Sequence, residues 1–225
     1  MLLVVAGIVT AAAYVLEDGN PDLRPGEAIP HAAQTRALLA GIPQRGIELG
    51  DPRAALALVE FGDLQSAQCA RFAAAVLPYL LRSYVRPGKL RLLFRSIDLL
   101  GPDSLRAARM AAALSQQDRL FQFATLMYHN LGMPNTGYVT DTYLRALAGA
   151  IAGAHVARAL GALNSPATDR QLRQTQELGA RLNISGAPVF LLQRSGRRPI
   201  LLRPAKLTVA SFAAALRQAQ DTAGP

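Results

Sequence analysis

Cysteine and tryptophan are almost missing from this sequence of 225 residues. The single cysteine, Cys69, excludes an internal disulfide framework and any zinc or iron–sulfur site built on cysteine ligands. Tryptophan is absent and aromatic residues make up 6%, too few to supply the stacking platforms that bind single-stranded nucleic acids. Charged residues make up only 17%, whereas 51% of the residues are hydrophobic. The sequence therefore predicts a chain that folds around a hydrophobic core and is not disordered.

The three histidines are too dispersed to suggest a metal centre. His31, His129 and His155 lie far apart in the sequence, and no two are spaced three or four residues apart. His129 lies in an apolar helical segment and His155 has no acidic partner at helical spacing, so each is more simply a structural or surface histidine than a catalytic base. We expect neither a metal nor a cofactor.

The basic residues give a net charge of +9, which usually raises the question of a nucleic-acid partner. They are scattered along the whole chain, and the densest group lies beside an apolar run and not among aromatic residues. This group consists of Arg194, Arg197, Arg198, Arg203 and Lys206. We therefore expect a solvated basic face, or one attracted to anionic lipid headgroups, and no nucleic acid.

Residues 1–16 contain no charge at all. They fall short of the roughly 20 residues that cross a bilayer comfortably, and no basic residue precedes them. Three interpretations stay open: an uncleaved N-terminal anchor, a signal segment cleaved near residues 11–13, or a start that lacks a basic leader. Each places the rest of the chain outside the cytoplasm, either at the cell membrane or secreted. A buried core helix fits less well, because a polar stretch follows directly.

The next part of the chain, residues 17–50, is rich in proline, glycine and charge, and we interpret it as a stem or linker that contains a short helix at 32–39. A buried strand is predicted at 54–63 and a second one at 89–99. Between them a helical pattern begins after Ser66, a typical N-cap. Pro78 lies inside this helical pattern and should kink the helix. The two strands of such a βαβ unit should be parallel.

From Asp103, which can cap a helix, the pattern is helical as far as about residue 182. We expect one helix running to about Met127, a second over 140–163, and a third that begins at Ser165-Pro166. A β-hairpin and a closing helix over 208–219 complete the chain.

This order, βαβ, then helices, then ββα, matches an α/β thioredoxin-like fold with an inserted all-helical domain. The thioredoxin-like part would comprise residues 51–102 and 183–219, and the inserted domain residues 103–182.

Two motifs carry a resemblance to one family. The active-site segment of the DsbA-like thiol–disulfide oxidoreductases, which leads from a strand into Cys-Pro-x-Cys at a helix N-terminus, is similar to LVEFGDLQSAQCARF. That family's loop with a cis-proline is similar to LNISGAPVFLL, and the stretch after its second strand to LFRSIDLLGPDSLRAARMAAAL. The resemblance covers roughly residues 46–217 and implies a thiol–disulfide oxidoreductase homologue.

The sequence departs from the family at the position that carries the chemistry. Aligned through Gln65, Ser66 stands at the first cysteine, Ala67 at the proline and Cys69 at the second cysteine. The first cysteine attacks a partner disulfide as a thiolate stabilised by the helix N-terminus, and the second resolves the mixed disulfide. A serine hydroxyl without a general base does neither, so the resemblance implies that dithiol catalysis is lost.

Several residues near this site have two interpretations. Cys69 is either a monothiol that forms mixed disulfides, resolved by an external thiol, or a packed cysteine of the first helical turn. Pro188 corresponds to the family's cis-proline and implies a groove for an extended polypeptide, unless it is a trans-proline that opens a strand. Asp63 corresponds to an acid of the family, or serves as a local turn residue. Glu60, inside an apolar strand, could shift a nearby proton equilibrium. The glycosylation sequon at Asn183 is best explained by chance.

Three functional hypotheses follow from these residues. The first is a membrane-tethered binding or chaperone-like module. Its active site is degenerate, but it keeps the groove for extended or unfolded polypeptides. The second is a monothiol oxidoreductase that uses Cys69 and a thiol-containing partner. The third is a purely structural extracytoplasmic domain in a larger complex. A thiol titration of the native protein discriminates the first two.

Overall fold

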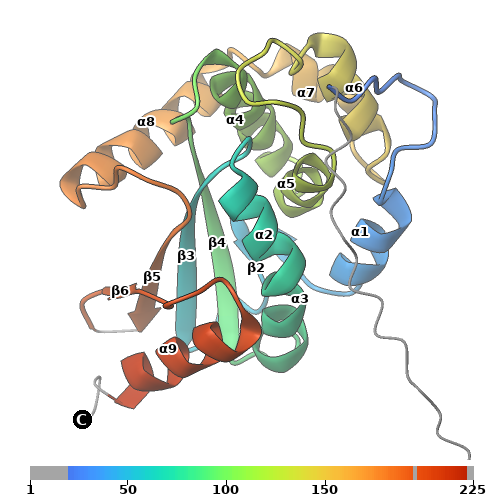
Figure 1. The fold of residues 1–225 in the computed structure, drawn as a ribbon. Coiled ribbons are helices and arrows are strands. Elements are labelled where there is room, and N and C mark those ends of the chain that lie inside the picture. Colours follow the sequence, from blue (N-terminus) through green and yellow to red (C-terminus); the bar gives the residue numbers. More distant parts are fainter. Residues whose placement is uncertain (1–19, 195–196, 222–225) are drawn as a thin grey trace, which may run out of the picture.

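A mixed sheet of six strands forms the centre of the computed structural model, which describes residues 20–194 and 197–221 (Figure 1). The strand order is β1-β2-β4-β3-β5-β6. In chain order the strands are β1 (Gln44–Arg45), β2 (Glu48–Leu49), β3 (Leu56–Asp63), β4 (Leu90–Ile97), β5 (Val189–Arg194) and β6 (Ile200–Leu202). β3 and β4 are parallel, as the βαβ pattern predicted, whereas β5 is antiparallel to β3 and forms the predicted hairpin with β6.

Both faces of the central strands are buried, which explains the nearly continuous apolar run of β3. Leu58 and Phe94 point into the larger hydrophobic cluster, on the side of the helix that follows β3. Val59 and Phe61 point to the opposite face, where they pack with Ile97 and Leu191. Successive residues of a strand alternate between faces, so one strand supplies two cores.

The crossover between β3 and β4 consists of α2 (Ala67–Ala75), α3 (Leu77–Leu80) and a π-helical turn, η1 (Leu81–Val85). The predicted cap is confirmed, because the backbone N–H of Cys69 donates to Ser66 Oγ at an N···O distance of 3.3 Å. The predicted interruption is found just before Pro78, whose ring nitrogen cannot donate to the helical ladder.

An aromatic cluster fixes this crossover to the sheet. Phe72 of α2 lies 4.5 Å from Phe190 of β5 and 5.4 Å from Phe212 between ring centroids. Phe212 belongs to the closing helix α9 (Val209–Asp221), and its ring meets Phe190 edge-on at 5.0 Å. The three rings therefore join α2, β5 and α9 on one side of the sheet (Figure 1).

Five helices lie between β4 and β5, and they gather mostly beyond one end of the sheet (Figure 1). They are α4 (Pro102–Ser115), α5 (Leu120–His129), α6 (Asp141–Gly149), α7 (Val156–Gly161) and α8 (Pro166–Arg181). Two predicted long helices are therefore wrong, because each is divided in two. The backbone takes a left-handed conformation at Asp118 (φ 57°), which ends α4, and a turn that contains Gly153 (φ 76°) separates α6 from α7.

Asp103 does not cap α4 as predicted. The N-cap residue is Gly101, and no side chain accepts a bond there. Asp103 lies in the first turn of α4 and is buried, and its Oδ2 accepts the backbone N–H of Gly137 at 2.8 Å. Its carboxylate thus connects α4 to the loop before α6.

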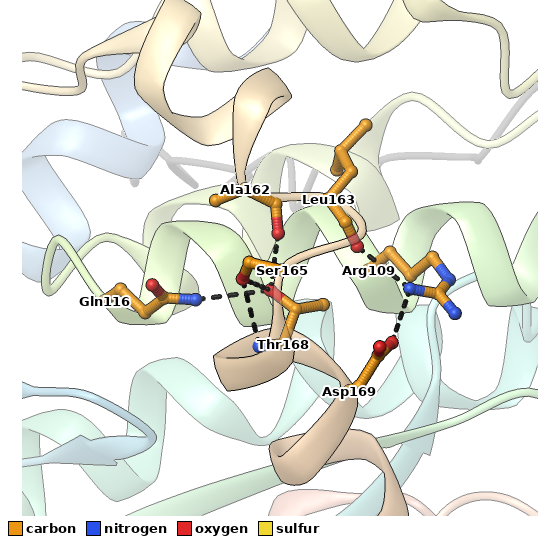
Figure 2. A network of polar contacts seen from close by, with 7 residues as sticks. All are labelled: Arg109, Gln116, Ala162, Leu163, Ser165, Thr168 and Asp169. Atoms are coloured by element: carbon orange, nitrogen blue, oxygen red, sulfur yellow. Dashed lines mark hydrogen bonds and ion pairs between the residues drawn. The ribbon is translucent and has the colours of Figure 1, made fainter.

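The predicted start of α8 is confirmed, and a polar network around it joins α8 to α4 (Figure 2). Ser165 Oγ accepts the backbone N–H of Thr168 at 3.3 Å. Arg109 of α4 donates to Asp169 and to the Leu163 carbonyl oxygen, both at 2.9 Å. Gln116 donates to Thr168 Oγ1 at 3.2 Å. These bonds place α8 against the sheet face that Phe61 and Leu191 line.

The interpretation of residues 17–50 as a stem or linker is wrong for residues 29–50, although the predicted helix at 32–39 is present as α1 (Ala32–Leu39). α1 packs on α5, and β2 pairs with β4 and buries Leu49 completely. The glycines that suggested a linker instead form tight turns around these short strands. Gly50, for example, has a φ of 113°, and a Cβ there would meet Val85 Cγ1 at 2.9 Å.

The proposed anchor or signal, residues 1–16, lies outside the described residues. Within residues 20–194 and 197–221, no helix is long and apolar enough to cross a membrane. The division into a thioredoxin-like part and an inserted domain at 103–182 stays a prediction.

The fold brings together two histidines that lie far apart in the sequence. The rings of His31 and His129 stack with centroids 4.4 Å apart and an interplanar angle of 16°. His31 precedes α1 and His129 ends α5, and Asn130 Nδ2 donates to the Pro30 carbonyl oxygen beside them at 3.2 Å. Burial lowers the pKa of His129, and the neighbouring His31 lowers it further. In the described part of the chain, no three potential metal-ligating side chains form a group.

We expect this stacked pair to weaken the fold in acid. The pKa of His129 is depressed only in the folded state, so the unfolded chain binds the proton first, and the free energy of unfolding falls as the pH drops from about 7 through the lowered pKa. His129→Gln should reduce this loss, measured by urea unfolding at pH 7.5 and pH 5. His155→Gln, at an exposed histidine, is the control. A variant that loses as much stability as the parent would contradict the prediction.

Candidate functional site

The candidate site lies at the carboxyl end of β3, where the first turn of α2 meets the loop that leads into β5. β3 and β5 are neighbours, with Phe61 opposite Val189, so the segments that follow one and precede the other lie at the same end of the sheet. The Ala187–Pro188 peptide bond is cis, as the resemblance implied. The topology thus places Pro188 at the same end of the sheet as Ser66 and Cys69.

Cys69 is inaccessible in this structure. Its side chain is completely buried, and desolvation raises the pKa of the thiol to about 12. The charge of Glu60 raises this pKa further, and the hydrogen bond from Ser66 lowers it too little to compensate. Since the thiolate is the reactive form, the burial and the raised pKa of Cys69 both disfavour its reaction at neutral pH.

Ser66 is 8% exposed and acts as the helix cap already described. At the N-terminus of α2 its hydroxyl oxygen occupies the position where the partial positive charge of the helix is strongest. The family places a thiolate at this position. Here a neutral oxygen accepts the N–H of Cys69, which is a capping role.

Glu60 and Tyr128 bring two buried oxygens close to Cys69. Within the described residues, Glu60 Oε1 has no hydrogen-bond partner, whereas the Tyr128 hydroxyl lies against the Cys69 thiol. Desolvation raises the pKa of Glu60 to about 8, and burial raises that of Tyr128 well above its usual value. Gly62 leaves room for both, because a Cβ there would lie 3.0 Å from the Tyr128 oxygen and 3.1 Å from Glu60 Oε1. The expectation that Glu60 shifts a nearby proton equilibrium agrees with its effect on Cys69.

Asp63 is a buried acceptor of four hydrogen bonds, which goes beyond the turn residue that the sequence suggested. Its Oδ1 accepts the Gln65 backbone N–H at 2.8 Å and the Ser104 hydroxyl at 2.7 Å. Its Oδ2 accepts the backbone N–H groups of Leu99 at 2.8 Å and Leu100 at 3.0 Å. The carboxylate therefore joins the end of β3 to the loop after β4 and to α4.

Sequence reasoning missed the roles of Gln65 and Ser104, which extend this network. Gln65 is 1% exposed, and its Nε2 donates to Ser104 Oγ at 2.7 Å. Its Oε1 accepts the backbone N–H of Asn135 at 2.9 Å, which reaches the loop before α6. The sequence does contain one signal of a buried polar network: Asp63 and Gln65 are polar residues on either side of Leu64, at the end of an apolar run. The sequence offered no indication of which groups they bind.

A groove of about 950 Å³ adjoins the site. It is lined by Gln68 of α2, residues 182–191, Arg198, Pro199, residues 201–204 and Leu207. Pro188 lies in its wall, and the sequon residue Asn183 is exposed at its side. His129 and His155 are not among its lining residues. The structure thus brings Ser66, Cys69 and Asp63 together around the start of α2 and places Pro188 in the groove.

Comparison with known proteins relates the chain to disulfide-forming proteins. The family model described as thioredoxin matches residues 44–198. A probable disulfide bond formation protein D of Bacillus cereus is 30% identical over 101 residues, which cover 44% of this chain and 47% of that protein. A protein of the same name from Bacillus anthracis is 26% identical over 143 residues, 62% of this chain and 66% of that protein. The matches thus span about half to two thirds of these relatives.

Solved structures share the fold. The oxidised BdbD of Bacillus subtilis superposes with a TM-score of 0.65 at 17% identity, covering 79% of this chain and 96% of BdbD. A thioredoxin-like oxidoreductase from Silicibacter pomeroyi gives 0.60 at 24% identity, with 83% and 98% covered. At these identities the likeness concerns the fold alone.

Asp63→Asn should lower the free energy of unfolding by about 1–3 kcal/mol, the cost of leaving buried groups unsatisfied. Each oxygen of the Asp63 carboxylate accepts hydrogen bonds from two donors. In the asparagine variant, the side-chain NH₂ group replaces one of these oxygens in either orientation, so two donors lose their acceptor. Chemical denaturation at neutral pH measures the loss. Asp22→Asn, at a side chain that is 77% exposed, is the control and should change stability by no more than about 0.5 kcal/mol. Equal losses in the two variants would argue against the four-bond network.

Glu60 should make the protein less stable in base. Its pKa is about 8 when folded and near its ordinary value when unfolded, so the stability present below about pH 4.5 is lost as the pH rises through 8. Glu60→Gln should flatten this profile and raise the free energy of unfolding at pH 9 by roughly 1–3 kcal/mol over the parent. At pH 4.5 the two proteins should differ little. Parallel profiles between pH 4.5 and pH 9 would refute the assignment.

Proposed function

This chain belongs to the thioredoxin family, and we propose that it is a DsbA-like member without dithiol catalysis that binds extended polypeptides in the groove beside Pro188. The observation that carries the proposal is the state of the cysteine positions. Ser66 stands at the first of them, and Cys69, the only cysteine of the chain, is buried with its pKa raised to about 12.

Thiol–disulfide exchange needs a thiolate that can reach a partner's sulfur. A serine at the helix N-terminus offers no sulfur, and a buried neutral thiol offers neither charge nor access. The chain has no second cysteine to resolve a mixed disulfide. Loss of turnover is therefore the expected result of this arrangement, with the fold around the site intact.

The groove supports the binding part of the proposal. It runs from the first turn of α2 past the Pro188 loop to the edge strand β6, and apolar side chains line much of it. An extended chain can add to an open strand edge through main-chain hydrogen bonds, while its side chains enter neighbouring pockets. Nothing in that mode of binding needs a thiol.

We propose further that this domain works outside the cytoplasm, with residues 1–16 as membrane anchor or signal. The uncharged composition of that segment supports this location. The relatives named for disulfide bond formation support it as well, because stable disulfides form in oxidising compartments.

A thiol titration combined with a refolding assay tests the proposal. In the native protein Cys69 should react with a thiol reagent at pH 7 at least 100-fold more slowly than in urea, because its thiol is buried and neutral. Oxidative refolding of a reduced, disulfide-dependent substrate should stay at the uncatalysed rate. Fast labelling of native Cys69 would instead favour the monothiol enzyme.

Ser66→Cys is the matched control for this test. Its new thiol lies at the helix N-terminus, three residues before Cys69, where the partial charge lowers a cysteine pKa. We expect an intramolecular disulfide on air oxidation, seen by mass spectrometry, and a measurable gain in refolding activity. Two free thiols, or only intermolecular dimers, would show that residue 66 does not face Cys69.

A further inference from the structure

Charge is unevenly distributed along the chain, although the composition alone does not show it. Between Glu177 and Asp221 the sequence has no acidic residue. The same segment contains seven basic residues: Arg181, Arg194, Arg197, Arg198, Arg203, Lys206 and Arg217. The segment forms the last turn of α8, the β5–β6 hairpin and nearly all of α9. Most of the net charge of +9 thus belongs to the part of the fold that builds the groove.

The groove itself is positively charged. Apart from Gln68, all of its lining residues come from this basic segment, and none of them is acidic. Two of them, Arg198 and Arg203, are exposed. Across residues 20–194 and 197–221, the ion pairs involve neither of these two guanidinium groups. The groove therefore presents fixed positive charge to any occupant.

The groove also has exposed apolar side chains and an open strand edge. Leu201 of β6 and Leu182 after α8 line it, and each is 41% exposed. β6 pairs only with β5 among the described strands, which leaves the outer edge of β6 without a strand partner. Such an edge is a template for an added strand. Leu201 and Arg203 are two residues apart, so an extended backbone directs both side chains to the same face.

We propose that the groove selects extended polypeptide segments in which acidic side chains lie two residues from an apolar one, on the same face of the segment, and that Arg198 and Arg203 determine this specificity. This inference rests on the proposed function, since it names the class of peptide that the same groove takes. An apolar side chain of the occupant would cover Leu201 and Leu182. Carboxylates two residues before and after it, on the same face, would meet the guanidinium groups, which bind carboxylates through two parallel hydrogen bonds.

The shape of the site favours a peptide over an anionic membrane. A lipid surface is flat and gathers scattered basic residues without regard to a concave site. Here two of the basic residues line a groove of about 950 Å³ next to a free strand edge. Complementary charge at such a site contributes chiefly to the choice among partners that share one backbone geometry.

Fluorescence anisotropy with three labelled peptides tests the inference on the full chain. The peptides share the pattern Xaa-Ser-Leu-Ser-Xaa, in which Xaa is glutamate, glutamine or lysine, so that the variable residues and the leucine lie on one face. The glutamate peptide should bind at least about tenfold more tightly than the glutamine peptide, and the lysine peptide more weakly than both. The preference should shrink as salt is added, because exposed charges are screened.

Two double variants with the same change in net charge locate the effect. Arg198→Gln with Arg203→Gln should weaken binding of the glutamate peptide about tenfold and leave the glutamine peptide unchanged. Arg158→Gln with Arg170→Gln changes two exposed arginines outside the groove and should have little effect. Circular dichroism confirms that each variant is folded.

The possible results separate the inference from the function on which it rests. Equal binding of all three peptides, unchanged by the groove variant, would overturn the charge selectivity and leave the peptide groove standing. Binding of none of them would overturn the proposed function together with the inference. Binding to phosphatidylserine vesicles that needs Arg198 and Arg203, with no preference among the peptides, would overturn the inference in favour of a membrane surface.

Discussion

The carboxylate of Asp63 holds together the segments that form the candidate site. It is buried at the end of β3 and accepts hydrogen bonds from the start of α2, from the loop after β4 and from α4. A buried carboxylate must be fully bonded, so the positions of these three segments are coupled through one side chain. Through Gln65 the same network reaches the loop before α6. The position of Ser66 at the head of α2 thus depends on the buried carboxylate of Asp63.

Next to this network, Glu60 Oε1 is buried without a hydrogen-bond partner in the described part of the chain, and the Tyr128 hydroxyl and the Cys69 thiol lie beside it in contact with each other. A proton on each group is the arrangement that burial permits, so the three groups stay neutral at moderate pH. Burial of these polar groups reduces stability. Ionising Glu60 would make a Cys69 thiolate still less favourable.

The features that could be predicted from the sequence depend on near neighbours in the chain. Ser66 and Ser165 cap helices because each acceptor lies three residues from its donor, and β3 follows from a nearly continuous apolar run. The features that could not be predicted depend on distant partners. Residues 29–50 have the composition of a linker, yet their short strands are held by pairing with β4. The stacking of His31 on His129, and the bonds of Asp63 to the loop after β4, exist only once the helices are placed.

In the proposed function, the loss of the first cysteine changes what the groove must supply. A mixed disulfide holds a client by a covalent bond, so the surrounding surface needs only to guide it. Without that bond, affinity comes entirely from apolar burial, main-chain hydrogen bonds and ion pairs, and each must offset the entropy of ordering an extended chain. The groove combines exposed leucines, a free strand edge and two arginines outside the ion pairs of the described residues. Since main-chain bonds form with any sequence, and leucines accept many apolar side chains, the arginines are the part of this surface that can distinguish one polypeptide from another.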